Sequence, residues 1–135
     1  MKTLISLLFG FFVVFFAYAQ EESENKPGPR ITFKETTHDF GEITQGDQVE
    51  HVFKFENTGT TPLILTNVQT TCGCTVPKWP REPILPGKEA EIKVKFNSTG
   101  KSGKVSKTIT IISNSVEPIT KINIKTNIVP KKTNG

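Results

Sequence analysis

Strict alternation of apolar and charged side chains from Glu89 to Phe96 constrains the fold more than any other feature of this sequence. Every second position in this segment is apolar: Ala90, Ile92, Val94 and Phe96. Because successive side chains of a β-strand point to opposite faces, the pattern predicts a half-buried antiparallel strand with one charged face. A helix would need apolar residues at intervals of three and four, which no segment beyond the N-terminal region keeps over three turns.

Further segments carry the same strand signals. The longer ones alternate at 49–56, 108–112 and 121–128, and shorter ones lie at 31–33, 40–43, 63–68 and 74–76. Turns rich in Gly, Asn and Pro separate them, among them Asn57-Thr58-Gly59. The sequence therefore predicts an all-β fold, an immunoglobulin-like β-sandwich of seven to eight antiparallel strands. We expect its core to contain the Ile and Val set with five phenylalanines: Phe33, Phe40, Phe53, Phe55 and Phe96.

The segment from Pro77 to Pro86 has a proline at every third position and interrupts the strand pattern. This spacing predicts an extended, polyproline-like connection that crosses the end of the sandwich from an edge strand to the next strand. Trp79 lies within it. Trp79 either packs over the end of the sandwich or stands exposed as a contact for a partner, since Trp is favoured in binding hot spots.

The N-terminal region has the three parts of a secretory signal peptide. Lys2 precedes an apolar run over residues 4–16, and Ala17-Tyr18-Ala19 provides a small-x-small cleavage pattern. The stretch 4–19 is shorter than the ~20 apolar residues that span a bilayer. We expect residues 1–19 to be removed on export to the periplasm or the cell exterior, leaving no membrane span.

The rest of the chain divides by composition. We expect a flexible leader over residues 20–30, a β-sandwich domain over 31–129 and a polar tail over 130–135. The basic residues are scattered along strands and loops and form no cluster, so we expect no nucleic-acid partner. We also expect the exported protein to be a monomer without a cofactor.

Cys72 and Cys74 are the two cysteines of the chain, and Gly73 separates them. In an extended strand, positions i and i+2 lie about 6.6 Å apart, which is too far for the Cβ separation of about 3.5–4.5 Å in a disulfide. The two residues can therefore pair only if the chain turns at Gly73, which glycine permits. Three interpretations stay open: a local structural disulfide, a redox-active pair, or a soft-metal site for Cu(I) or Zn with His38 and His51 as further ligands.

The remaining polar candidates are weaker. His51 shares a strand face with Phe53 and Phe55 and has no evident acid or nucleophile partner, which favours a packed or rim histidine over a catalytic base. His38 and Asp39 are neighbours on a predicted strand, so their side chains face opposite ways. We expect Asp39 to bond backbone N–H groups at a nearby turn.

A series of motifs resembles one protein family. These are Thr37-His38-Asp39-Phe40-Gly41-Glu42-Ile43, the run from Val52 to Gly59, Pro62-Leu63, Thr71-Cys72-Gly73-Cys74-Thr75 and Leu85-Pro86-Gly87. Together they resemble the bacterial domain-of-unknown-function 1573 family, which is similar to the Hydin-like immunoglobulin-like domains. The resemblance covers about residues 31–128. It implies an exported β-sandwich, common in the envelopes of Bacteroidetes, without an established catalytic activity.

No P-loop, dinucleotide fingerprint or nucleophile elbow occurs in the sequence. We therefore expect a protein that is not an enzyme, a binding or scaffolding module that contacts an unidentified envelope or extracellular protein. The alternative is a thiol-redox or copper-handling protein that uses Cys72 and Cys74. A third reading is a chaperone-like sandwich with an exposed hydrophobic edge.

Overall fold

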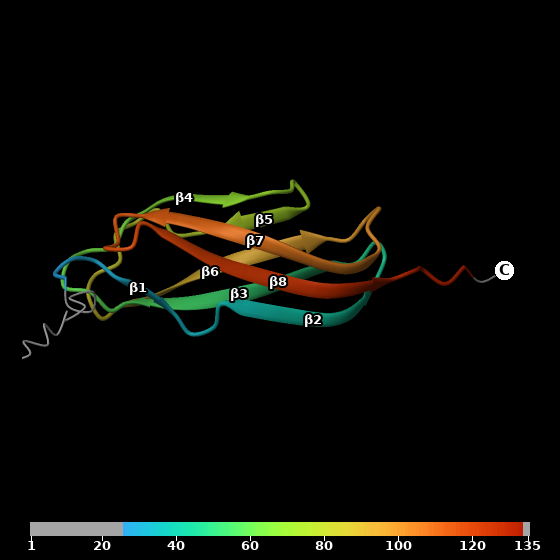
Figure 1. The fold of residues 1–135 in the computed structure, drawn as a ribbon, viewed down its shortest axis with the longest axis horizontal. Helices are drawn as coiled ribbons and strands as arrows, with labels where there is room; N and C mark the ends of the chain where they lie inside the picture. Colours follow the sequence, from blue (N-terminus) through green and yellow to red (C-terminus); the bar gives the residue numbers. More distant parts are fainter. Residues whose placement is uncertain (1–25, 134–135) are drawn as a thin grey trace, which may run out of the picture.

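The computed structural model describes residues 26–133, and these form two packed four-stranded sheets (Figure 1). The strands are β1 (Ile31–Phe33), β2 (Thr37–Thr44), β3 (Gln48–Asn57), β4 (Leu65–Thr70), β5 (Thr75–Lys78), β6 (Glu89–Asn97), β7 (Gly103–Ser113) and β8 (Ile119–Val129). One sheet has the order β1-β3-β6-β5 and the other β2-β8-β7-β4. The prediction of an all-β sandwich is confirmed, and eight strands fall within the predicted number.

Strand direction differs from the prediction at one pair. β2 and β8 run parallel, whereas every other pair in the two sheets is antiparallel. The reason lies in residues 34–36, where the chain passes from the sheet of β1 to the sheet of β2 and continues in the same direction (Figure 1). The sequence has strand signals on both sides of this crossing, but nothing in it reveals that the chain changes sheets.

The core lies between the two sheets and follows the predicted alternation. Phe53, Phe55 and Phe96 are fully buried. Phe33 and Phe40, which the sequence places in the core, pack against it but stay partly exposed. Both lie on edge strands, β1 and β2, where one flank has no neighbouring strand to cover the ring.

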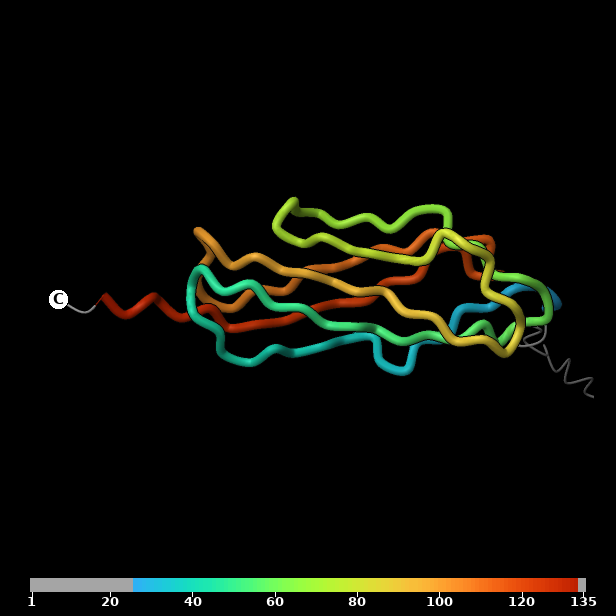
Figure 2. The backbone as a smooth tube through the Cα atoms, turned by 180° about the vertical axis from the view of Figure 1, so that it is seen from behind, coloured from blue at the N-terminus to red at the C-terminus, as the bar shows by residue number. Residues whose placement is uncertain are grey.

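Only part of the proline-rich segment is a connection without strand structure, because its first residues belong to β5. β5 includes Pro77 and forms the edge of its sheet, where a residue without an N–H group is tolerated. The chain then leads to β6, and on the way Ile84 and Leu63 exchange two backbone hydrogen bonds of 2.8 Å. In the view from behind, the segment from β5 to β6, coloured yellow-green to yellow, crosses one end of the sandwich (Figure 2).

One end of the sandwich is organised by Asn57, the last residue of β3, which is fully buried. Its Nδ2 donates to the carbonyl oxygens of Thr61 and Ile84, both at 2.8 Å. Its Oδ1 accepts from the backbone N–H groups of Gly59, at 3.0 Å, and Arg30, at 3.3 Å. The sequence places Asn57 in an ordinary turn; in the structure it joins three loops.

Residues 28–30, which the sequence assigns to a flexible leader, form hydrogen bonds with loops of the sandwich. The N–H of Thr60 donates to Gly28 O, the N–H of Thr58 donates to Arg30 O, and the N–H of Val116 donates to Pro29 O, each at 2.9 Å. The packed part of the chain therefore begins at Gly28, three residues before the predicted domain start. The predicted signal peptide, the rest of the leader up to residue 25 and the last two residues of the tail lie outside the described residues.

Candidate functional site

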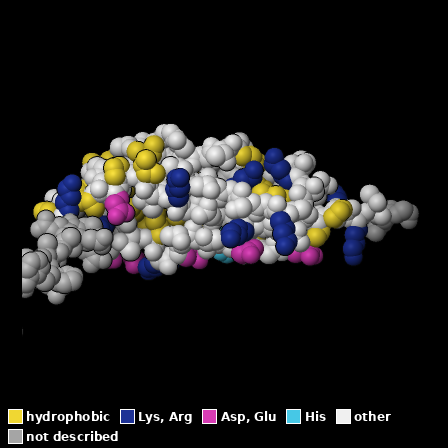
Figure 3. All heavy atoms as spheres, in the orientation of Figure 1, with side chains coloured by type: hydrophobic (Ala, Val, Ile, Leu, Met, Phe, Trp, Pro, Cys, Tyr) yellow, Lys and Arg dark blue, Asp and Glu magenta, His cyan; other side chains and the backbone are white. Residues whose placement is uncertain are grey.

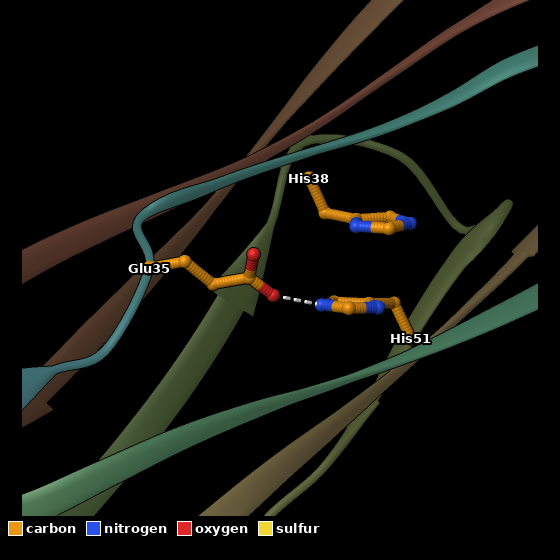
Figure 4. Close-up of side chains that lie close together, drawn as sticks. All are labelled: Glu35, His38 and His51. Atoms are coloured by element: carbon orange, nitrogen blue, oxygen red, sulfur yellow. Dashed lines mark hydrogen bonds and ion pairs between the residues drawn. The ribbon is translucent and has the colours of Figure 1, made fainter.

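Three polar side chains converge where the chain crosses between the sheets (Figure 4). Glu35 lies on the crossing segment, His38 lies on β2 of one sheet and His51 lies on β3 of the other. The two imidazole rings stack with centroids 3.5 Å apart and an interplanar angle of 6°. Glu35 Oε1 and His51 Nε2 form an ion-pair contact. We call Glu35, His38 and His51 the histidine cluster.

The surroundings of the histidine cluster are aromatic on one side and open on the other. The ring of Phe40 meets His38 edge-on at 4.6 Å, and the ring of Phe53 meets His51 edge-on at 4.8 Å. The side chain of His51 is 21% exposed and that of Glu35 is 44% exposed. The cluster therefore sits at the rim of the core, where small ions and polar groups from solvent can reach it.

The surroundings of His38 change its pKa. Burial, followed by the neighbouring His51 ring, lowers the pKa of His38 below its ordinary value of 6.5, against the opposing effects of Glu35 and Asp39. Its ring is therefore neutral at pH 7 and has a nitrogen lone pair. Among residues 26–133, no hydrogen-bond partner contacts either ring nitrogen of His38.

Asp39 does not join its neighbour in the histidine cluster. Its Oδ1 accepts a hydrogen bond of 2.8 Å from the N–H of Gly41, as expected for an acid that stabilises a local turn. Gly41 has a φ of +71°, a conformation that glycine adopts without strain. The sequence pair His38-Asp39 is thus not a base with its orienting acid.

Cys72 and Cys74 lie apart from the histidine cluster, at the tip that joins β4 to β5. The structure joins them by a disulfide with a Cα–Cα distance of 5.2 Å, shorter than the extended spacing. The chain turns here as pairing requires: the N–H of Thr75 donates to Cys72 O at 3.2 Å. Gly73 makes this turn without a positive φ. Joined in this way, the two sulfurs offer no thiolate to a metal.

Trp79 follows β5 and is half-buried. One side of its ring packs against the core, and the guanidinium of Arg81 lies 3.7 Å from the ring centroid. A shallow hollow of about 400 Å³ lies beside it, with Lys78 and Lys93 in its lining. Trp79 is thus neither fully buried nor freely exposed, and its role as a contact for a partner stays a prediction.

The cluster brings together two of the four metal-ligand candidates from the sequence, His38 and His51, and it leaves out both cysteines. Glu35 was missed. One ligand atom from each of Glu35, His38 and His51 lies within 4.8 Å of the others. No spacing rule in the sequence links the three, because they meet only through the crossing between sheets. Chemically, a carboxylate and two imidazoles can hold a divalent ion or exchange protons.

The exterior of the described residues carries scattered charge. On the visible face the basic side chains are scattered and most acidic side chains lie along the lower edge, with no single basic surface (Figure 3). Two exposed ion pairs join strands or loops, Lys34 with Glu89 at 2.9 Å and Lys95 with Glu50 at 3.2 Å. The Lys34 ammonium lowers the pKa of Glu89 by hydrogen bonding. No helix within residues 26–133 is long and apolar enough to cross a membrane.

Comparison with known proteins gives a family and a fold. The model of a family described as a protein of unknown function (DUF1573) matches residues 31–128. No curated protein matches the chain. A protein of unknown function from Porphyromonas gingivalis W83 is similar, with a TM-score of 0.66 and 21% identity over 75% of this chain and 47% of its own. The chain thus spans about half the length of that protein.

Two more distant structures share the architecture. The ASH/PapD-like domain 7 of human CEP192 has a TM-score of 0.65 and 9% identity, covering 80% of this chain and 91% of its own. The secreted serine protease VesC from Vibrio cholerae has a TM-score of 0.59 and 12% identity, covering 77% of this chain and 24% of its own. At these identities, the likeness shows a shared β-sandwich fold.

Proposed function

The chain belongs to the DUF1573 family, and from its edge strands we propose that it is a non-enzymatic, exported binding module of the bacterial envelope that takes up an extended segment of a partner protein. The observation that carries the proposal is the outer edge of β4. Within residues 26–133, β4 pairs with β7 alone, so its other flank has unpaired backbone groups. Such a flank can accept a partner strand by backbone hydrogen bonding.

The other three sheet edges carry protective features that β4 lacks. β1 has three residues, and β2 carries two acidic residues, Asp39 and Glu42. β5 contains Pro77 followed by Lys78. Short strands, charges and prolines all disfavour edge pairing. β4, with the sequence Leu-Thr-Asn-Val-Gln-Thr, shares a register shift with β2, but it has six residues and neither a charge nor a proline.

Two observations support export. The N-terminal residues have the charged, apolar and small-residue parts of a signal peptide. The Cys72–Cys74 disulfide suits an oxidising compartment such as the periplasm. Mass measurement of the protein recovered from the periplasm or medium tests this part. A chain shortened by residues 1–19 is expected, and a full-length chain confined to the cytoplasm would contradict it.

A capture experiment with a blocked edge tests the binding proposal. Thr66→Lys and Gln69→Lys place two charges on exposed positions of β4 and should prevent strand addition. A matched control places the same charges at exposed Gln48 and Thr99, away from β4. We expect immobilised wild type and control to retain the same envelope protein and the blocked variant to lose it. Equal capture by all three would contradict the proposal.

A second candidate function, thiol–disulfide exchange, is favoured by the position of the disulfide. Cys72 and Cys74 are half-exposed in the turn that joins β4 to β5, where a dithiol can approach. A bond that closes so short a loop adds only about 1.5 kcal/mol to stability. Stabilisation alone is therefore a weak reason for this disulfide. A titration with dithiothreitol and glutathione buffers decides between the two functions. A potential near those of catalytic dithiols, above about −270 mV, would favour exchange.

A further inference from the structure

The histidine cluster has a composition and a placement that its contacts within the chain do not account for. Its side chains come from the crossing segment and from one strand of each sheet, and they meet at the open rim between the sheets (Figure 4). Ordinary packing explains the aromatic contacts of the two rings. The Glu35 carboxylate contacts His51 alone and leaves the ring nitrogens of His38 without a polar partner among residues 26–133.

The contacts within the cluster leave coordination capacity unused. Glu35 contacts His51 through one carboxylate oxygen, Oε1. Among residues 26–133, neither nitrogen of His38 has a hydrogen-bond partner. A carboxylate with two imidazoles is one of the ligand sets found in zinc sites that keep a position open for water.

The distances suit a small metal ion. One ligand atom of each residue lies within 4.8 Å of the other two. With Zn–N bonds of about 2.0–2.1 Å, two ligand atoms on one tetrahedral zinc lie roughly 3.4 Å apart, so small movements would bring the three atoms onto an ion. The rings stack in parallel, and a metal lies in the plane of each ring it binds. Binding must therefore tilt His38 and His51 out of their stack.

We propose that Glu35, His38 and His51 bind one divalent transition-metal ion of the zinc class, with water in the remaining coordination position. Imidazole and carboxylate ligands together favour zinc over calcium or magnesium, which take oxygen ligands. The ion would link the crossing segment with β2 and β3 and so fasten the two sheets at their open rim. This site is independent of β4 and of the disulfide.

Calorimetric titration of the metal-stripped, tag-free chain with zinc tests the proposal. We expect one ion per chain and a rise in the melting temperature, because a ligand that binds only the folded state stabilises it. Glu35→Gln and His51→Gln should each weaken binding by at least ~10-fold, the smallest loss usual even for groups outside the ligand shell. Glu50→Gln, an exposed acid on the same strand as His51, is the matched control and should bind as wild type does.

Two further measurements keep the proposal falsifiable. The variant with Cys72→Ser and Cys74→Ser should bind zinc with unchanged affinity, whereas loss of binding would assign the metal to the cysteines. If a histidine variant does not fold, side-chain NMR of the wild type replaces it, and zinc should shift the ring nitrogens of both His38 and His51. Absence of these shifts, or equal affinity in wild type and His51→Gln, would overturn the proposal.

Discussion

Asn57 and the histidine cluster are both polar groups beside the core, yet they use their hydrogen-bonding capacity in opposite ways. Asn57 is fully buried, and backbone groups occupy both its donor and its acceptor atoms. The histidine cluster is half-exposed, and among the described residues the nitrogens of His38 are unpartnered. A polar residue whose bonds are all used by the chain is structural, whereas unpartnered nitrogens at an accessible rim are open to water or to a ligand.

The backbone around Asn57 also differs from the backbone at the histidine cluster. Around Asn57 the loops approach so closely that a Cβ at Gly59 would lie 2.5 Å from Arg30 N and closer still to Gly28 O. The histidine cluster is instead reached by the crossing segment, which has no regular strand structure between Phe33 and Thr37. Close packing fixes the first region, whereas the segment that carries Glu35 lies outside the regular strands.

Replacing Asn57 should produce the largest effect. Asn57→Ala removes four hydrogen bonds to the backbone. Ile84 O keeps the N–H of Leu63 as a partner, but the other three backbone groups lose theirs. The cost is about 1–3 kcal/mol for each unpartnered group that stays buried. We expect unfolding free energy to fall by about 3–5 kcal/mol, measured by urea denaturation. Asn97→Ala, which removes a single bond to the N–H of Thr99, is the control and should cost about 1 kcal/mol. Similar losses would mean that Asn57 has no special role.

Gly59→Ala should be the next most damaging change. The added methyl group would overlap the backbone of Gly28 and Arg30, so the loops around Asn57 must separate. We expect a loss of about 1–3 kcal/mol and a lower melting temperature, measured by calorimetry. Gly73→Ala is the matched control, because Gly73 has open space around it and no positive φ. A stable Gly59 variant would show that this end tolerates displacement and would weaken the contrast with the rim.

Removing the disulfide should have a smaller effect than either change at the Asn57 end. The bond closes a loop of three residues, and the chain-entropy contribution of such a loop is about 1.5 kcal/mol. We expect the double serine variant at Cys72 and Cys74 to unfold cooperatively with a loss of about that size or less. A far larger loss in urea denaturation would make the turn between β4 and β5 a structural element comparable with Asn57 and would argue against an exchange function.

Much of the fold could be predicted because alternation acts locally. The pattern around Ile92 and Val94 directly reports which face of β6 is buried, and both residues are fully buried. The parallel pairing of β2 with β8 could not be predicted, since the crossing at residues 34–36 changes sheets without a recognisable turn. Phe33 and Phe40 were placed too deep because the sequence does not show which strands form the edges.

Less of the candidate site than of the fold could be predicted from the sequence. His38 and His51 were recognised as metal-ligand types, but their proximity depends on the two sheets packing face to face. Glu35 carried no signal, since an acidic residue between two strands usually belongs to an ordinary solvated turn. Asn57 was taken for a turn residue because the sequence does not reveal that three loops close over it.

The contrast between the two polar regions is tested most directly by urea unfolding of wild type and His51→Gln, each with and without excess zinc. The account predicts metal-free curves within about 1 kcal/mol of each other, because His51 has no buried partner that depends on it. Zinc at 100 times its dissociation constant should then stabilise wild type by about 2.7 kcal/mol and leave the variant unchanged. A metal-free variant as unstable as Asn57→Ala, with no zinc effect on wild type, would contradict the account.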